Sequence, residues 1–293
     1  MQIIKTERGD VIETKMVYDN GEVDILEFRP LEGGKRRYLL NGAPVTGVTT
    51  ILNKEAKPQL LDWAVKLAYE ECLKLDNTRI QKILDEKDWA SKRNSGSAME
   101  IGTQAHAWVE DYAKAHISNK KIPALPDDKE LHQILQPFVD WCNGRVPVMA
   151  KKNSYDKNSV NLAPMDHVKF LESEMTTVSK SRFFAGTFDL LIEIDGKKFL
   201  ADFKTSSGIY GRSYFYQMAA YRSAWQEMGY DNDIAGTVVI RCGKGGNDLE
   251  VQASYTNERD YKGFLACLAL YKLGEVDYEI ETEFKNDSTQ DPI

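Results

Sequence analysis

Two β-prone segments, residues 185–194 and 197–204, flank the dipeptide Asp195-Gly196. An Asp-Gly pair between two such segments is a strong signal for a two-residue hairpin turn, because both turn residues need positive φ. A symmetric turn places Asp189 directly opposite Asp202. Side chains alternate between the faces of a strand, so Asp189, Asp202 and Lys204 are predicted to share one face.

Two acidic residues facing each other on apolar strands require compensation. Like charges directly opposite each other destabilise a sheet, and an ionised group resists burial unless it is paired. A divalent cation would satisfy both carboxylates, and Mg²⁺ is commonly held by one or two of them. The ammonium of Lys204 could then orient or help to deprotonate an attacking water and stabilise charge on a phosphate. The alternative is that Lys204 only neutralises Asp202 at the sheet edge, as Lys198 would neutralise Glu193.

Composition excludes some classes of protein. With 293 residues the chain suits one large domain with additions, or two domains. No apolar run reaches the roughly 20 residues of a membrane span, and the first residues do not resemble a signal peptide. We therefore expect no membrane partner and a cytoplasmic location, which would be the host cytoplasm for a phage-encoded protein. The net charge of −7 argues mildly against a protein that coats nucleic acid, but it permits an enzyme with a local basic channel.

The four cysteines are widely scattered, without a Cys-x-x-Cys pair or a Cys/His cluster. This spacing predicts reduced, mostly buried thiols and indicates neither a zinc site nor an iron–sulfur cluster.

The remaining chain divides into recognisable segments. Residues 1 to about 52 are predicted to be β-rich. Helices are predicted near 58–72, 78–92, 98–116, 128–143, 211–228 and 257–273, with a Ser/Gly break at 95–97 and a bend at Pro137. Strands are predicted over 167–204, 234–242 and 249–255. Residues 145–166 are predicted to form a polar loop.

Further candidate residues lie on both sides of the hairpin. His106 and Glu110 are four apart on one helix face, and Gly102, one turn earlier, would allow close approach. Glu174 lies one strand before the hairpin, but Glu172 has the same parity, so spacing leaves both open.

Downstream, Gln217 and Tyr221 are four apart on a helix, where they could contact nucleic acid or simply belong to the core. Arg222 beside them is a further candidate for substrate contact, as is Arg182, which precedes the hairpin in a cationic pair with Lys180. Cationic runs such as 35–37, which contains Arg37, could contact phosphate or form an ordinary solvated surface.

The order of these motifs resembles the PD-(D/E)XK nuclease superfamily. Within it the match is to the RecB-like exonuclease branch, which includes CRISPR adaptation nucleases and the mitochondrial genome maintenance exonuclease. The resemblance covers about residues 38–230. The motifs that carry it are Gly102-x-x-x-His106, Glu174, Gly186 to Asp189, Asp202 to Ser206, and Gln217-x-x-x-Tyr221. Segments 38–42, 48–52 and 60–63 are also similar to those that precede the core in phage and mitochondrial members.

The resemblance implies a role for each matching residue. Asp189 and Asp202 would bind Mg²⁺ or Mn²⁺, with the Phe203 carbonyl completing the site and His106 as a further ligand. Lys204 would position the nucleophilic water, and Glu174 would assist the metal site. Gln217 and Tyr221 would orient the lysine or the DNA strand.

The sequence departs from the family pattern in three ways. Residue 188 is Phe where the family name has Pro, and the second acid, Asp202, is Asp rather than Glu. The cysteine pattern of the iron–sulfur members is missing, so no cluster is expected.

The implied fold is α/β: a restriction-endonuclease-like core with a central mixed β-sheet flanked by helices. The expected division is an N-terminal β-rich and helical extension over 1–95, the nuclease core over 96–280 and a flexible tail over 281–293. The extension is expected to form a wall or arch over the active site.

The implied activity is metal-dependent hydrolysis of DNA from its ends, giving 5′-phosphate products. A structure-specific endonuclease with the same chemistry is one alternative. A non-catalytic binding or assembly protein on a nuclease fold is the other. By analogy alone, a role in phage-type recombination, replication or repair is expected, with a single-strand annealing protein as partner and with oligomerisation allowed.

Overall fold

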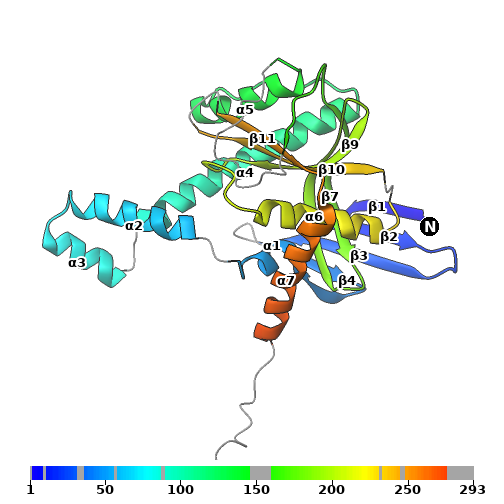
Figure 1. Ribbon diagram of the computed structural model, residues 1–293, viewed down its shortest axis with the longest axis horizontal. Coiled ribbons are helices and arrows are strands. Elements are labelled where there is room, and N and C mark those ends of the chain that lie inside the picture. The colour runs from blue at the N-terminus through cyan, green and yellow to red at the C-terminus, as the bar shows by residue number, and fades with distance from the viewer. Residues whose placement is uncertain are drawn as a thin grey trace, which may run out of the picture.

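The computed structural model describes residues 2–8, 11–31, 36–55, 58–86, 90–145, 160–230, 233–244 and 248–275. The strands are β1 (Gln2–Arg8), β2 (Val11–Val17), β3 (Val23–Pro30), β4 (Arg36–Leu40), β5 (Ala43–Gly47), β6 (Val160–Asn161), β7 (Lys169–Ser179), β8 (Phe184–Ile194), β9 (Lys197–Lys204), β10 (Ile234–Cys242) and β11 (Leu249–Ser254). The helices are α1 (Val48–Leu52), α2 (Pro58–Cys72), α3 (Asn77–Glu86), α4 (Ala90–Ile117), α5 (Lys129–Cys142), α6 (Ser213–Glu227) and α7 (Asn257–Glu275). The fold is mixed α/β, as the sequence predicted (Figure 1).

The strands of the described chain join into one mixed sheet that does not close into a barrel. Its order is β1-β2-β3-β4-β5-β8-β9-β10-β11-β6, with β7 on the other edge of β8. The β5–β8 and β9–β10 pairs are parallel, and the remaining pairs are antiparallel. The N-terminal strands are therefore continuous with the strands that carry the predicted site.

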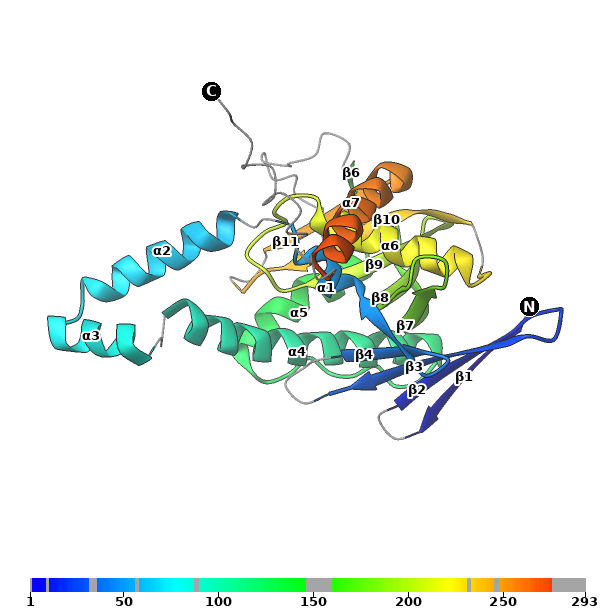
Figure 2. The same ribbon diagram turned by 90° about the horizontal axis from the view of Figure 1, so that it is seen from below.

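Helices cover both faces of the central strands (Figures 1 and 2). Leu190 and Ile192 of β8 pack with α4 and α5, whereas Leu191 between them packs with α1, α6 and α7. This alternation is what a strand buried on both faces requires. Phe188, next to Asp189, and Phe203, next to Asp202, are also fully buried. The two acids therefore lie on strands surrounded by apolar side chains.

One prediction about the helix boundaries is wrong. The expected Ser/Gly break at 95–97 is absent, because α4 runs without interruption from Ala90 to Ile117. A single helical Gly costs only about 1 kcal/mol relative to Ala, which a long helix tolerates. The expected boundary between the extension and the core, at 95/96, thus lies inside α4. The expected bend residue Pro137 lies within α5.

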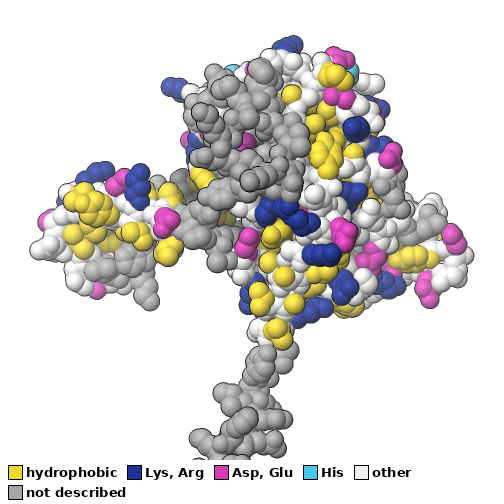
Figure 3. Space-filling model, in the orientation of Figure 1, with side chains coloured by type: hydrophobic (Ala, Val, Ile, Leu, Met, Phe, Trp, Pro, Cys, Tyr) yellow, Lys and Arg dark blue, Asp and Glu magenta, His cyan; other side chains and the backbone are white. Residues whose placement is uncertain are grey.

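Two helices of the extension stand away from the sheet. In both ribbon views α2 and α3 project beyond the first turns of α4 (Figures 1 and 2). Several apolar side chains of α2, among them Leu61 and Tyr69, are exposed, and hydrophobic side chains are visible on this arm in Figure 3.

The cysteines are mostly buried, as predicted. Three of the four, Cys142, Cys242 and Cys267, are buried, while Cys72 is exposed.

Two predicted segments cannot be compared in full. The tail 281–293 and most of the loop 145–166 lie outside the described residues. Among the helices of the described chain, none combines the length and apolarity needed to cross a membrane.

Candidate active site

The β8–β9 hairpin has the predicted turn and register. Asp195 and Gly196 have φ values of 50° and 76°, the positive values that a tight hairpin turn needs. The ladder pairs Ile194 with Lys197 and continues to Leu190 and Ala201, so the next facing position is Asp189 and Asp202. The hairpin therefore has the register that the sequence predicted.

The two acids lie where the sheet forks. Both β5 and β9 pair with the edge of β8 that faces away from β7, but at different places: β5 at Phe184 and Ala185, and β9 from Leu190 onward. Between these places the edge of β8 has neither strand beside it. At the fork, Asp189 Oδ2 accepts a hydrogen bond from the Phe203 backbone N–H at 2.7 Å. The hairpin thus opens beside its acidic residues.

Each acid has a cationic neighbour. His106 Nδ1 lies 3.4 Å from Asp189 Oδ2, and Lys204 Nζ lies 2.5 Å from Asp202 Oδ2. Asp189 and Asp202 are 8% and 2% exposed, so these neighbours compensate charges that have little access to water. The Lys204–Asp202 contact is also what simple neutralisation at the sheet edge would give. The contribution of His106 from a separate helix goes beyond that alternative.

The electrostatics distinguish the two acids. Burial alone would raise the pKa of Asp189, but the charges of His106 and Lys204 and the Phe203 N–H lower it to about 2. Burial, aided by the charge of Asp189, raises the pKa of Asp202 despite the opposing effect of Lys204. A pair of neighbouring acids whose pKa values move apart is typical of functional sites.

The pKa values of the two cationic groups are raised although both groups are partly buried. Burial would lower the pKa of His106 and of Lys204, but the carboxylates outweigh it and raise both. Lys204 therefore stays an ammonium at neutral pH. It suits the stabilisation of negative charge better than the removal of a proton.

Helix α4 brings His106 to the hairpin. The imidazole packs edge-on against Phe203, with 5.4 Å between ring centroids. One turn earlier, a Cβ on Gly102 would lie 3.2 Å from Thr205 Oγ1, so the glycine permits the close approach of β9 that the sequence suggested. Glu110 lines the same cavity as His106, as their spacing of four predicted.

The structure separates Glu174 from Glu172. In the β7–β8 register Glu174 falls opposite Asp189, between the pairs Ser173–Leu190 and Met175–Phe188. Its φ is 47°, an uncommon value for a non-glycine residue within a strand. Glu174 lines the cavity beside His106 and Lys204, whereas Glu172 is exposed and lines neither of the two cavities at the hairpin.

Gln217 and Tyr221 reach the fork from α6. Gln217 Nε2 donates to Tyr221 Oη at 2.9 Å. The Tyr221 ring packs on Gly186 so closely that a Cβ there would lie 2.2 Å from Tyr221 Cε1. This contact explains why the β8 motif needs Gly at that position. Tyr221 is buried, so it supports the wall of the site from within the core as well as lining it.

The two arginine candidates are not brought to the acids. Arg182 is exposed in the turn between β7 and β8, next to Ser179, whose Oγ accepts from its backbone N–H. Arg222 faces β10, where its guanidinium donates to the Ile234 carbonyl at 2.6 Å. Neither lines the cavities at the hairpin. Clustering along the sequence suggested both, but Arg182 lies in a turn and Arg222 on a part of α6, and neither position is at the acids.

Two cavities meet at His106, one on each side of the hairpin end. The first, about 740 Å³, lies between α4, Glu174 and the end of β9. The second, about 700 Å³, lies between the fork, α6 and the β4–β5–α1 segment, and both acids line it. Of the residues in the second cavity's far wall, the sequence singled out Arg37, as a member of the cationic run 35–37. It gave no role to the others, because the similarity of segments 38–42 and 48–52 to those that precede nuclease cores carried no residue roles.

The donors suit a hard cation held by few protein ligands. Among the described residues, no group of three or more His, Cys, Asp and Glu side chains forms a ready metal-binding cluster. Mg²⁺ does not require one, because it keeps several waters and is usually held by one or two carboxylates together with substrate phosphates. The approach of His106 and Lys204 to the buried carboxylates marks a place where positive charge is favoured.

Comparison with known proteins adds little to this geometry. No protein-family model matches the sequence, and no curated protein matches it. One solved structure with partial similarity is that of SSO0001, at 12% identity and a TM-score of 0.24 over 34% of this chain. The match spans half the length of that protein, 50%. A similarity this low supports no argument about fold or function.

Proposed function

We propose that this protein is a divalent-metal-dependent deoxyribonuclease with a restriction-endonuclease-like core that hydrolyses phosphodiester bonds from DNA ends. The observation that carries the proposal is the convergence of Asp189, Asp202 and Lys204 with His106 from a distant helix. These residue types stand in the order of the PD-(D/E)XK motifs, and their contacts agree with the roles that the resemblance implies.

The carboxylates and one backbone carbonyl fit the proposed metal. Asp189, Asp202 and the Phe203 carbonyl would hold Mg²⁺ or Mn²⁺, with His106 as a further ligand. When bound, the ion supplies Lewis-acid polarisation of the phosphate. Both acids are buried on strands, which fixes their positions before the substrate arrives.

The chain's own side chains carry the remaining steps. Lys204, an ammonium near the cavity beside α4, stabilises negative charge that develops on the phosphate oxygens and orients the attacking water. Gln217 and Tyr221 hold the wall behind Asp189. Glu174 faces the same cavity as Lys204 and accepts hydrogen bonds from water there.

A cleavage assay tests the proposal directly. End-labelled linear DNA and circular DNA, each in single- and double-stranded form, are incubated with the full chain and Mg²⁺. We expect linear DNA to be degraded, circular DNA to survive, and EDTA to abolish the reaction. Cleavage of circles would favour the endonuclease alternative, and DNA binding without release of nucleotides would favour the non-catalytic one.

Replacing Lys204 tests the centre of the site. We expect Lys204→Ala to reduce cleavage by about 10²-fold or more, because one preorganised charge-stabilising group is lost. Lys197→Ala, at the exposed start of the same strand, is the matched control and should retain wild-type activity. Lys204→Ala leaves the buried Asp202 without its cationic neighbour, so circular dichroism and thermal unfolding are measured beside each assay. A Lys204→Ala variant that is folded and fully active would refute the proposed site.

A further inference from the structure

The second cavity has a wall that belongs to the N-terminal extension. Asp189 and Asp202 line this cavity. Another part of the lining comes from the β4–β5–α1 segment, more than 130 residues earlier in the chain, and includes Arg37, Tyr38, Gly47, Val48, Thr49 and Thr50. One cavity thus joins the acids to a surface that no proposed catalytic motif contains.

This wall is attached firmly to the strand that carries Asp189. Tyr38 is buried, and its hydroxyl lies 3.2 Å from Thr187 Oγ1, which in turn lies 3.1 Å from Thr176 Oγ1 of β7. The pairing of Thr46 and Gly47 with Phe184 and Ala185 continues the attachment. The position of the wall relative to the acids is therefore set by strand pairing and buried hydroxyl contacts.

The wall and the acids have opposite charge character. Arg37 is exposed, and it is the cationic residue of this segment among the described residues that line the cavity. Thr49 and Thr50 line the same cavity, are exposed and carry hydroxyl groups. A guanidinium matches phosphate geometry with two parallel hydrogen bonds, and hydroxyl groups add further donors. The acids repel phosphate unless a metal is present, so the wall is the part of the cavity that attracts phosphate by itself.

We propose that this wall binds a backbone phosphate of the DNA strand that is cleaved, with Arg37 as its charged contact and Thr49 and Thr50 as hydroxyl contacts. The inference rests on the proposed nuclease function and extends it to a substrate subsite. A cavity of about 700 Å³ is the size of a small-molecule pocket, so it can hold a few nucleotides of one strand but is too small to enclose a duplex. The extension thereby selects an unpaired strand.

Arg29 provides a matched control for Arg37. The two arginines face each other in the β3–β4 ladder, on the same part of the extension. The Arg29 guanidinium lies 2.5 Å from Glu27 Oε2 and does not line the cavity. Arg37→Gln and Arg29→Gln therefore remove the same charge from neighbouring positions, and only the first changes the proposed subsite.

The experiment measures binding and cleavage by the full chain. Fluorescence anisotropy with a labelled single-stranded oligothymidylate in EDTA gives Kd over a range of salt concentrations without cleavage. With Mg²⁺, the same strand gives KM and kcat. We expect Arg37→Gln to raise Kd and KM by about tenfold and to reduce the slope of log K against log salt by about 0.7, the value for one lost phosphate contact on a single strand. KM should change more than kcat.

The outcomes separate the subsite from the activity. Equal effects of Arg37→Gln and Arg29→Gln, or no effect of either on an active enzyme, would overturn the subsite and leave the proposed nuclease standing. Binding that depends on Arg37 in a protein that cleaves nothing would support the subsite and refute the nuclease. Equal affinity for a blunt duplex of the same length would overturn the selection of an unpaired strand.

Discussion

Glu174 shows how one backbone conformation changes the surroundings of the acids. Its φ of 47° lies in the left-handed region, in the middle of an otherwise extended strand. Such a conformation costs a non-glycine residue about 1–2 kcal/mol. Strained residues of this kind collect at functional sites, where the surrounding structure holds them in place. Here the strained position places the carboxylate in the cavity beside Lys204.

Replacing Glu174 by Gly should separate stability from activity. Glycine adopts positive φ without a steric penalty, so we expect Glu174→Gly to leave the free energy of unfolding unchanged or slightly higher. We expect cleavage to fall, because the carboxylate is lost. Urea unfolding and the linear-DNA assay measure the two effects.

The control lies two residues away. Glu172 is exposed on the same strand and is not among the residues with positive φ. Glu172→Gly should lower the free energy of unfolding by about 0.5–1 kcal/mol and leave cleavage unchanged. Equal destabilisation by the two glycines would show that the Glu174 backbone stores no strain.

At the scale of elements, the N-terminal meander is tied to the central sheet by a buried carboxylate. Asp24 of β3 accepts hydrogen bonds from Tyr18 at 2.9 Å, Asn41 at 2.8 Å and Lys180 at 2.8 Å. Lys180 belongs to the turn between β7 and β8, so this contact crosses from the extension to the central strands. The wall that carries Arg37 depends on this attachment and on the β5–β8 pairing.

Asp24→Asn should make this attachment weaker in a pH-dependent way. Burial would raise the pKa of Asp24, but its three donors and the charge of Lys180 lower it below 3.8. A carboxyl group whose pKa is lowered by folding stabilises the fold above its unfolded pKa, and this contribution is lost as pH falls through the folded pKa. We expect Asp24→Asn to cost about 1 kcal/mol at pH 7, since solvent screens the exposed Lys180.

Urea unfolding of both proteins from neutral to acidic pH checks the sign of this effect. The difference between wild type and Asp24→Asn should shrink below an ordinary Asp pKa of 3.8 and approach zero once Asp24 is protonated. A difference that grows on acidification would contradict the assignment. Asp62→Asn, at an exposed position on α2, is the control.

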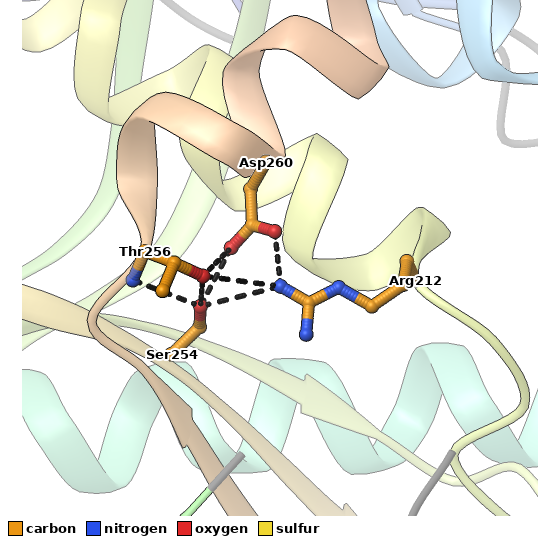
Figure 4. A network of polar contacts seen from close by, with 4 residues as sticks. All are labelled: Arg212, Ser254, Thr256 and Asp260. Atoms are coloured by element: carbon orange, nitrogen blue, oxygen red, sulfur yellow. Dashed lines mark hydrogen bonds and ion pairs between the residues drawn. The ribbon is translucent and has the colours of Figure 1, made fainter. Parts of the chain in front are cut away.

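At the scale of the whole molecule, a buried polar network joins the C-terminal helix to the core (Figure 4). Arg212, just before α6, donates to Asp260 in the first turn of α7. The other Asp260 oxygen accepts from Ser254 at 2.6 Å, at the end of β11. The Arg212 and Asp260 side chains are 12% and 1% exposed. One network thus holds β11, α7 and the start of the helix that carries Gln217.

Breaking this network should destabilise the whole fold. Asp260→Ala leaves the Arg212 guanidinium without its counter-ion, and loss of one partner of a buried pair costs about 3–5 kcal/mol. Glu258→Ala removes an exposed acid from the same helical turn, where it pairs with the exposed Lys262. We expect chemical unfolding to show a large loss for the first variant and none for the second. Similar midpoints for both would refute the role of the network.

Much of the acidic site could be predicted from the sequence because it depends on local chemistry. The Asp195-Gly196 turn fixes its own φ values, and the twofold alternation of a strand then fixes which side chains share a face. The helical spacing of His106 with Glu110, and of Gln217 with Tyr221, is local in the same sense. No long-range contact is needed to derive any of these relations.

Other features depended on contacts that local patterns do not encode. Spacing left Glu172 and Glu174 equivalent, and the tertiary structure distinguished them by the positive φ of Glu174 and by its place in the cavity beside Lys204. The Ser/Gly segment at 95–97 predicted a break, yet α4 continues because the cost of one Gly is small against a long helix. Clustering also suggested Arg182 and Arg222, neither of which lines the cavities at the hairpin.

The sequence by itself determined the acidic hairpin, because turn geometry and strand alternation act over a few residues. Only the tertiary structure decided what faces that hairpin. The parallel pairing of β5 with β8 and the packing of α4 bring Arg37 and His106 into the cavity that the acids line. Such pairings join segments far apart in the chain, and their choice depends on the burial of whole surfaces rather than on any local motif.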